Sequence, residues 1–349
     1  MRARNGIHAL LVPLLLLAGV AALSCDSLMP AMGSYDEIFV VSDRGPGEEL
    51  MAPLRGCFEI AFETVQEETL FHLVPLSVRQ LKEAQNRKNY LVLVDLSDRN
   101  ATFDMATKLL GRATMNEALR AGKPAAYFVD NAYSHQQVHA FLLAPRSSAF
   151  PKAIGDQGPS IRNQFLQANR RRILEFLLFR GEKRTLARNI YERFGWSIRI
   201  PSGFTPTLDH LGGDFFSMMM DRPGRRFFVW WKDSVETLPE PGEVMALRDS
   251  LGRLYYEEDF VEPSRTTTTR ADFQGREAVR VTGLWQNDPK VIGGPFRSIA
   301  FVDAAKRRLY LLDYAVYAPG FTKKYYLWEL ESVLGTFSLE PPPDQEEGS

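Results

Sequence analysis

The sequence has few of the residues that disulfides, metal centres and common catalytic motifs require. Two cysteines, Cys25 and Cys57, and five histidines occur in 349 residues. The chain contains no Cys-x-x-Cys pair, no Gly-x-Ser-x-Gly nucleophile elbow and no Gly-x-Gly-x-x-Gly nucleotide loop. These absences leave no cofactor, metal or catalytic residue to assign. They favour a protein that is not an enzyme, without excluding one.

Neither sign of charge is in excess. The chain has 42 Lys and Arg residues against 43 Asp and Glu, a formal net charge of −1. Nucleic-acid-binding proteins usually show a clear basic excess, so no nucleic-acid partner is expected. The basic clusters at 169–172 and 305–310 are short and adjoin apolar residues, which is typical of a solvated face. The apolar fraction of 45% is enough for a buried core.

The N-terminus has the pattern of an export signal. Arg2 and Arg4 precede an apolar run at 9–23, which is short for a membrane span of about 20 residues. The run ends in Ala-Leu-Ser-Cys, which resembles the lipobox of bacterial lipoproteins. That resemblance implies cleavage after Ser24 and acylation of Cys25, with several acyl chains such as palmitate anchoring the protein in the bilayer. An ordinary signal peptide and an uncleaved anchor are the alternatives.

This reading divides the N-terminal region into a signal peptide, 1–24, and a lipidated tether, 25–34. The tether is rich in small and turn-forming residues and would hold the folded part off the membrane. Lipidation of Cys25 leaves Cys57 without a disulfide partner in the same chain. Cys57 lies on the apolar face of a predicted helix, which favours a buried structural thiol over a nucleophile.

Strands and helices alternate through residues 35–183, which predicts an N-terminal α/β domain. The run at 89–97 is almost wholly apolar, so we expect a central strand buried on both faces. The other predicted strands are 37–43, 70–76 and 124–130, and the predicted helices are 48–65, 104–119 and 160–179.

Residues 184–338 predict a C-terminal α+β domain, mainly an antiparallel sheet packed with helices. Residues 196–201 alternate with period two, and hairpins are expected to turn at 272–275 and 303–306. Helices are expected at 243–254 and 322–337, and an acidic disordered tail at 339–349. Four aromatic residues at 227–231 should face alternately to the two sides of the sheet, one set into the core and the other either under a helix or on an exposed ligand or partner patch, with the core favoured. The predicted fold class is α+β, a mixed α/β protein in two domains.

The stretch GLWQNDPKVIGGPF, residues 283–296, lies between two predicted hairpins. Asn-Asp-Pro favours a chain reversal, and Gly-Gly permits a positive φ or a close backbone approach. The stretch lacks the Gly-Lys-Ser/Thr ending of a phosphate loop. Two interpretations stand: a strand connection with a bulge, or the rim of a ligand or partner site. The candidate rim residues are Trp285, Asn287, Asp288, Gly293, Gly294 and Arg297.

Two further clusters suggest chemistry only weakly. His135 and His139 are spaced to share one face of a helix, but Gln136 stands where a zinc protease has its glutamate base. A polar helix face is the favoured interpretation. Residues 257–259 supply three consecutive carboxylates, and acid–base catalysis needs two carboxylates in different environments. A solvated loop is therefore favoured there.

Several longer motifs carry a family resemblance. The chain contains, in order, YDEIFVVSD, KNYLVLVDLSD, GWSIRIPSGF, GLWQNDPKVIGGPF and YAVYAPGFTKKYYLWELESVL. In this it resembles the DUF4837 family of uncharacterised Bacteroidota lipoproteins over about residues 35–337. The resemblance implies a cell-envelope lipoprotein and offers no catalytic residues to transfer. The second half is also faintly similar to the Mog1/PsbP-like sandwich, whose members are mostly binding or assembly modules, although fold alone does not fix function.

Taken together, the sequence predicts a lipid-anchored envelope protein, with the outer membrane favoured, that binds a partner protein or a small ligand. Its other partner is the bilayer, through acylated Cys25. The alternative is a hydrolase- or transferase-like enzyme whose interdomain site is not visible as a motif. A purely structural envelope component is a third possibility.

Overall fold

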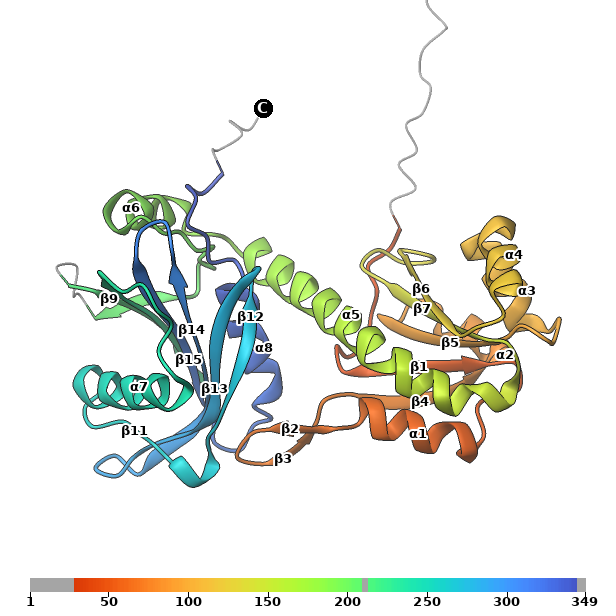
Figure 1. Cartoon of the computed structure of the whole chain (residues 1–349), viewed down its shortest axis with the longest axis horizontal. Helices are drawn as coiled ribbons and strands as arrows, with labels where there is room; N and C mark the ends of the chain where they lie inside the picture. The colour runs from red at the N-terminus through yellow and green to blue at the C-terminus, as the bar shows by residue number, and fades with distance from the viewer. Residues whose placement is uncertain (1–27, 209–212, 344–349) are drawn as a thin grey trace, which may run out of the picture.

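The computed structural model describes residues 28–208 and 213–343. The predicted signal peptide, Cys25 and residues 344–349 of the predicted tail lie outside this part of the chain. Within it the protein has an α+β fold with two main sheets, as the sequence predicted (Figure 1). No helix among the described residues combines the length and the apolar character needed to cross a membrane.

The N-terminal half is built on a five-stranded sheet with the order β4-β1-β5-β7-β6. Its parallel strands are β1 (Glu37–Ser42), β4 (His72–Ser77), β5 (Asn89–Asp95) and β7 (Val138–Ala144), and β6 (Ala125–Asp130) runs antiparallel at one edge. Six of the seven residues of β5 are buried, which confirms the prediction of a central strand covered on both faces.

Helices cover both faces of this sheet. One face packs against α1 (Glu48–Phe58) and α5 (Phe150–Phe179), and the other against α3 (Ala101–Leu110) and α4 (Arg112–Ala121). The short helix α2 (Val78–Leu81) follows β4. The predicted helix 48–65 ends earlier, at Phe58, because the chain then turns into a small hairpin of β2 (Ala61–Glu63) and β3 (Glu67–Thr69). This hairpin extends toward the C-terminal half (Figure 1).

Helix α5 begins ten residues before its predicted start and contains Pro159 in its interior. Proline removes one helical hydrogen bond, yet buried residues on both sides of it, Phe150, Ile154 and Ile161, keep one apolar stripe in register against the sheet. Packing therefore outweighs the local penalty. The polar helix face favoured for His135 and His139 is wrong, because residues 131–137 form bends with an isolated bridge at His135, and His139 belongs to β7.

The thiol of Cys57 lies where α1 meets α5. A side chain in place of Gly158 would bring its Cβ within 2.4 Å of Cys57 Sγ, so glycine permits the close approach of the two helices. Burial raises the pKa of the Cys57 thiol, which lowers the thiolate fraction. Cys57 is half-buried where a buried thiol was predicted, and both observations agree with a structural role.

The C-terminal half is an eight-stranded antiparallel sheet with the order β11-β13-β14-β15-β10-β9-β8, and β12 pairs with β13. The strands are β8 (Thr205–Leu208), β9 (Phe215–Met220), β10 (Gly224–Asp233), β11 (Phe260–Val261), β12 (Thr267–Phe273), β13 (Arg276–Asn287), β14 (Ile292–Asp303) and β15 (Arg308–Tyr317). Helix α7 (Pro241–Tyr255) covers one face and α8 (Lys324–Leu334) the other, while α6 (Arg184–Phe194) follows α5. In β10, Phe227 and Trp231 face the α8 side, and Phe228 faces α7.

The two halves share one continuous hydrophobic core. A single cluster of buried residues runs from Ile38 in β1 to Leu312 in β15. At the junction, Trp328 of α8 contacts Phe62 and Phe71 of the N-terminal half, with ring centroids 6.1 and 6.2 Å apart. Helix α8 therefore belongs to both halves.

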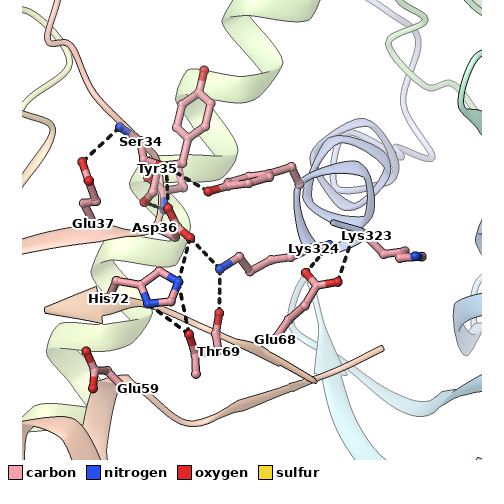
Figure 2. A network of polar contacts seen from close by, with 12 residues as sticks. Ser34, Tyr35, Asp36, Glu37, Glu59, Glu68, Thr69, His72, Lys323 and Lys324 are labelled. Atoms are coloured by element: carbon pink, nitrogen blue, oxygen red, sulfur yellow. Dashed lines mark hydrogen bonds and ion pairs between the residues drawn. The ribbon is translucent and has the colours of Figure 1, made fainter. Parts of the chain in front are cut away.

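Polar contacts reinforce this junction at the start of α8 (Figure 2). Lys324 Nζ donates to Asp36 Oδ2 and to the carbonyl of Thr69, each at 2.6 Å, and both charged side chains are buried. The hydroxyls of Ser34 and Tyr325 lie 2.8 Å apart. We call these contacts the α8 clasp.

Glu68 completes the α8 clasp by capping the helix. Its carboxylate accepts hydrogen bonds from the backbone N–H groups of Lys323 at 2.8 Å and Lys324 at 2.9 Å. These N–H groups have no partner within the helix, and a negative charge at a helix N-terminus also interacts favourably with the helix dipole. A side chain from β3 thus satisfies the first turn of a helix more than 250 residues later in the chain.

The α8 clasp predicts a pH dependence of stability. Burial alone would raise the pKa of Asp36, but hydrogen bonds from Lys324, Ser34 and Tyr325 hold it below its ordinary value of 3.8. Stabilisation by this carboxylate is therefore present above that value and is lost as the pH falls through the lower folded pKa. Asp36→Asn leaves Lys324 buried without its counter-ion, and should lower the free energy of unfolding at neutral pH by about 3–5 kcal/mol.

Urea unfolding of the wild type and Asp36→Asn between about pH 6 and pH 3 measures this effect. The difference in the free energy of unfolding between the two proteins should become smaller as the pH falls toward 3. Asp98→Asn, on an exposed turn, is the control and should show no such change. A gap that is independent of pH would contradict the role given to Asp36.

Candidate binding site at the end of the eight-stranded sheet

A cavity of about 960 Å³ lies at one end of the eight-stranded sheet. It is bounded by the turn between β9 and β10, the segment after α7, the hairpin between β13 and β14, and the segment from β15 into α8. These segments are distant in sequence, and the sheet brings their ends together. Six aromatic side chains line the cavity: Tyr255, Tyr256, Trp285, Tyr317, Phe321 and Tyr326.

Two adjacent arginines enter the cavity wall from β10. Consecutive strand residues point to opposite faces of a sheet. Arg225 accordingly pairs with Glu329 of α8, whereas Arg226 pairs with Asp259 in the segment after α7. Each guanidinium thus has a carboxylate partner, and the pairs fix the two helical layers against the end of the sheet.

The guanidinium of Arg226 is held between two aromatic rings. It lies 4.0 Å from the ring centroid of Tyr256 and 4.4 Å from that of Trp285. Cation–π contacts at desolvated positions contribute about 2 kcal/mol or more each. Asp259 is buried and neutralises the guanidinium, so this wall of the cavity presents a rigid aromatic surface with little net charge.

Burial dominates the ionisation of Tyr256, raising the pKa of its phenol to about 12. The ring therefore stays neutral at physiological pH. Trp285 is also buried, and neither its indole Nε1 nor the Nε of Arg226 has a hydrogen-bond partner among the described residues. Both N–H groups are buried, with almost no surface open to the cavity.

Asn287 does not line the cavity but holds two of the segments that bound it. Its buried side-chain amide donates to the carbonyl of Glu257 and to Asp259 Oδ1, both at 2.8 Å, and its Oδ1 accepts from the backbone N–H of Lys290 at 3.0 Å. Asn287 thus ties the hairpin turn to the segment after α7. Asp288 is exposed in that turn, where its carbonyl accepts from Val291.

The glycine pair lies within β14, where neighbouring backbone approaches closely. A Cβ at Gly294 would stand 2.0 Å from the carbonyl oxygen of Val316, and one at Gly293 would stand 2.7 Å from that of Trp285. Any side chain there would displace the adjacent strand. Pairing of β13 with β14 runs from end to end without a register shift, so the predicted bulge is absent.

Arg297 is not part of this cavity. Arg297 pairs with Thr282, and paired residues share a face of the sheet. Thr282 is three positions from Trp285 along β13, an odd number, so the two residues face opposite sides. Arg297 therefore projects from the α8 face of the sheet. Its guanidinium lies 4.4 Å from the ring centroid of Phe62, at the junction of the two halves. Trp285 therefore lines this cavity, and Asn287 and Asp288 lie in the hairpin beside it. Arg297 lines a different cavity, on the opposite face of the sheet.

Sequence reasoning missed Arg226 and misjudged residue 259. Glu257 and Glu258 are exposed as a solvated loop predicts, but Asp259 is buried against Arg226. The two partners lie 33 residues apart, so no local pattern shows the pair. His139 is also buried, stacked 4.4 Å from Tyr90, and burial lowers its pKa to about 3. Within the described part of the chain, no group of three or more His, Cys, Asp or Glu residues could hold a metal ion.

A family model matches most of the C-terminal half. Residues 183–336 match the family model described as a domain of unknown function, DUF4837. This confirms the family resemblance over those residues, and the wider span of 35–337 stays a prediction. No curated protein matches the chain.

Among solved structures the likeness is weak. A crystal structure from Bacteroides thetaiotaomicron is 13% identical, with a TM-score of 0.25, and the match covers 44% of this chain and 46% of that one. The chain thus spans less than half of that protein. The Saccharomyces cerevisiae Ran-binding protein Mog1p is 11% identical, with a TM-score of 0.30, and the match covers 42% of this chain and 90% of Mog1p.

The Arg226–Asp259 pair predicts a large effect of one substitution. Arg226→Met leaves a buried carboxylate unpaired and should lower the free energy of unfolding by about 3–5 kcal/mol. Arg226→Met combined with Asp259→Leu should recover part of that loss, since no unpaired charge remains. Arg222→Met, in the exposed turn before β10, is the control and should change stability by about 0.5 kcal/mol or less. Chemical denaturation measures all three, and equal effects at 222 and 226 would contradict the assignment.

Proposed function

We propose that this protein is a binding module of the cell envelope, whose aromatic cavity takes a small apolar or aromatic ligand. The observation that carries the proposal is the wall formed by Tyr256, Arg226 and Trp285, in which the charge is already paired with Asp259. A ligand at this wall meets aromatic side chains and a guanidinium whose charge is already balanced by Asp259. Such a surface favours a flat or acyl group with few polar atoms.

The size and form of the cavity support the same function. Its volume of about 960 Å³ is at the upper end of the range usual for small-molecule sites. Three of the charged side chains along it, Arg225, Arg226 and Lys290, are paired with Glu329, Asp259 and Glu257. The exposed turn before β10 adds Asp221 and Arg222, which are of opposite charge. The alternative of a hydrolase- or transferase-like enzyme needs a base or nucleophile free to act. Asp259, the buried carboxylate of the wall, is instead occupied by Arg226.

The envelope location rests on the N-terminal sequence. Two arginines, an apolar run and Cys25 after Ala-Leu-Ser support a lipoprotein whose signal peptide ends at Ser24. Acyl chains on Cys25 would hold the protein at a membrane, with the outer membrane favoured. The family matched by residues 183–336 is one of unknown function and does not bear on this location.

Binding of an uncharged apolar probe tests the cavity. N-phenyl-1-naphthylamine should bind the wild type with increased fluorescence, and Tyr317→Ala with Phe321→Ala should weaken binding about tenfold, since two rings of the rim are lost. Both residues are partly exposed, so the fold should persist. Phe179→Ala removes a ring that is 91% exposed at the end of α5 and serves as the control. An equal loss in the control, or no loss in the double variant, would refute the proposed site.

Intact-mass analysis and membrane fractionation test the anchor. The native protein should begin at Cys25, carry added acyl mass and sediment with membranes. Cys25→Ala should abolish both the added mass and the membrane association. A native protein that is soluble, or that retains residues 1–24, would contradict the lipoprotein assignment.

A further inference from the structure

A second cavity, of about 700 Å³, lies between the two halves of the molecule. Its floor is the α8-facing side of β13, β14 and β15, and its walls are α5 and α8. Figure 1 shows α5 crossing from the N-terminal half to the C-terminal half beside these elements. We call this cavity the interhelical cleft. It shares no lining residue with the aromatic cavity.

The interhelical cleft has an excess of positive charge, although the whole chain is close to neutral. Among the described residues, the charged side chains that line it are four arginines and two carboxylates: Arg170, Arg171, Arg280, Arg297, Asp272 and Glu331. Glu331 is shared, since it lies 2.7 Å from Arg170 and 3.5 Å from Arg297. Asp272 Oδ1 accepts from the backbone N–H of Gly275, which stabilises the turn after β12. The charged side chains that line the cleft therefore carry a formal net charge of +2, from four arginines and two carboxylates.

Several guanidinium donors in the cleft have no protein partner. Within the described chain, the guanidinium groups of Arg171 and Arg280 form neither a hydrogen bond nor an ion pair. The Nε atoms of Arg170 and Arg297 are buried and also lack a partner. These buried Nε atoms have almost no surface open to the cleft, whereas Arg171 and Arg280 are exposed. The donors available to a ligand in the cleft are therefore mainly those of Arg171 and Arg280.

The position of Arg280 adds a second argument. β13 and β14 place Arg297 opposite Thr282, so Arg280 lies diagonally from Arg297 on the same face of the sheet. Diagonal neighbours on one sheet face are about 7–8 Å apart, within reach of long side chains, so one anion between the two arginines could contact both. Arg170 and Arg171 approach this face from α5. The guanidinium groups therefore come from three separate elements, and a bound anion would meet them from more than one direction.

We propose that the interhelical cleft binds a phosphate group, as a free phosphate monoester or as the headgroup of a lipid. Guanidinium forks form paired hydrogen bonds with phosphate oxygens, and arginine is the residue preferred for such recognition. A tetrahedral dianion offers acceptors in several directions at once, which suits donors on two strands and a helix. It also balances the two excess positive charges of the cleft.

The test uses the full-length chain with Cys25→Ala, so that no lipid anchor attaches it to membranes. Isothermal titration with inorganic phosphate and with glycerol 3-phosphate measures binding of free phosphate. Co-sedimentation with phosphatidylcholine vesicles, with and without phosphatidic acid, measures binding of a lipid headgroup. Arg171→Gln with Arg280→Gln removes the two unpaired guanidinium groups and should weaken binding about tenfold or more.

The control is Arg112→Gln with Arg120→Gln, which removes two exposed charges from α4, away from the cleft. It should bind as the unsubstituted protein does. Binding of the free phosphates that depends on Arg171 and Arg280 supports a soluble ligand, and the same dependence seen only with phosphatidic acid vesicles supports a lipid headgroup.

Equal binding by the cleft variant and the α4 control, or no binding to either kind of probe, would overturn the proposal. Circular dichroism establishes that both variants are folded, and Arg171→Gln alone provides a milder change. Tyr317→Ala with Phe321→Ala should leave phosphate binding unaltered, so failure of the cleft and failure of the aromatic cavity can be told apart.

Discussion

The attachment of α8 to the N-terminal half sets the position of both cavities. Helix α8 covers one face of the C-terminal sheet, but its first turn is capped by Glu68 and its Lys324 is paired with Asp36. Both cavities use this helix. Tyr326 lines the aromatic cavity and Glu331 lines the interhelical cleft. The contacts that hold α8 in place therefore also position one wall of the aromatic cavity and one wall of the interhelical cleft.

A buried ion pair is a costly way to join two surfaces, because removing two charges from water offsets much of their attraction. Here the cost is reduced by additional hydrogen bonds, since Lys324 also donates to Thr69 and Asp36 accepts from Ser34. The aromatic contact of Trp328 with Phe62 and Phe71 supplies apolar burial beside the pair. We infer that burial provides most of the stability and that the polar pair selects one docking position.

Local sequence patterns predicted much of the fold. The apolar run of β5 and the turns of the β12–β13 and β14–β15 hairpins are encoded in neighbouring residues, so period and turn chemistry were enough to find them. The start of α5 was missed because Pro159 marks a helix boundary in most sequences. The apolar residues on both sides of Pro159 form one stripe that packs against the sheet. Tertiary packing, and not local sequence, therefore determines where α5 begins.

The candidate site was harder to predict than the fold. Trp285 and the Asn-Asp-Pro turn stood out locally, and the cavity does form around the hairpin that contains them. Arg226 and Asp259 did not stand out, because the sequence does not show whether a charged residue is exposed or forms a buried ion pair with a distant partner. Arg297 was grouped with Trp285 by proximity in sequence, whereas strand alternation sends the two to opposite faces.

The shared position of Trp328 has a consequence for the order of events during synthesis. The N-terminal half is made first, but the aromatic surface of Phe62 and Phe71 is covered by a helix that begins at residue 324. Until the last part of the chain is available, that surface stays open to solvent and to other chains. A nascent chain would therefore expose this aromatic patch until residues 324–334 have been synthesised, and formation of α8 is the step that covers it.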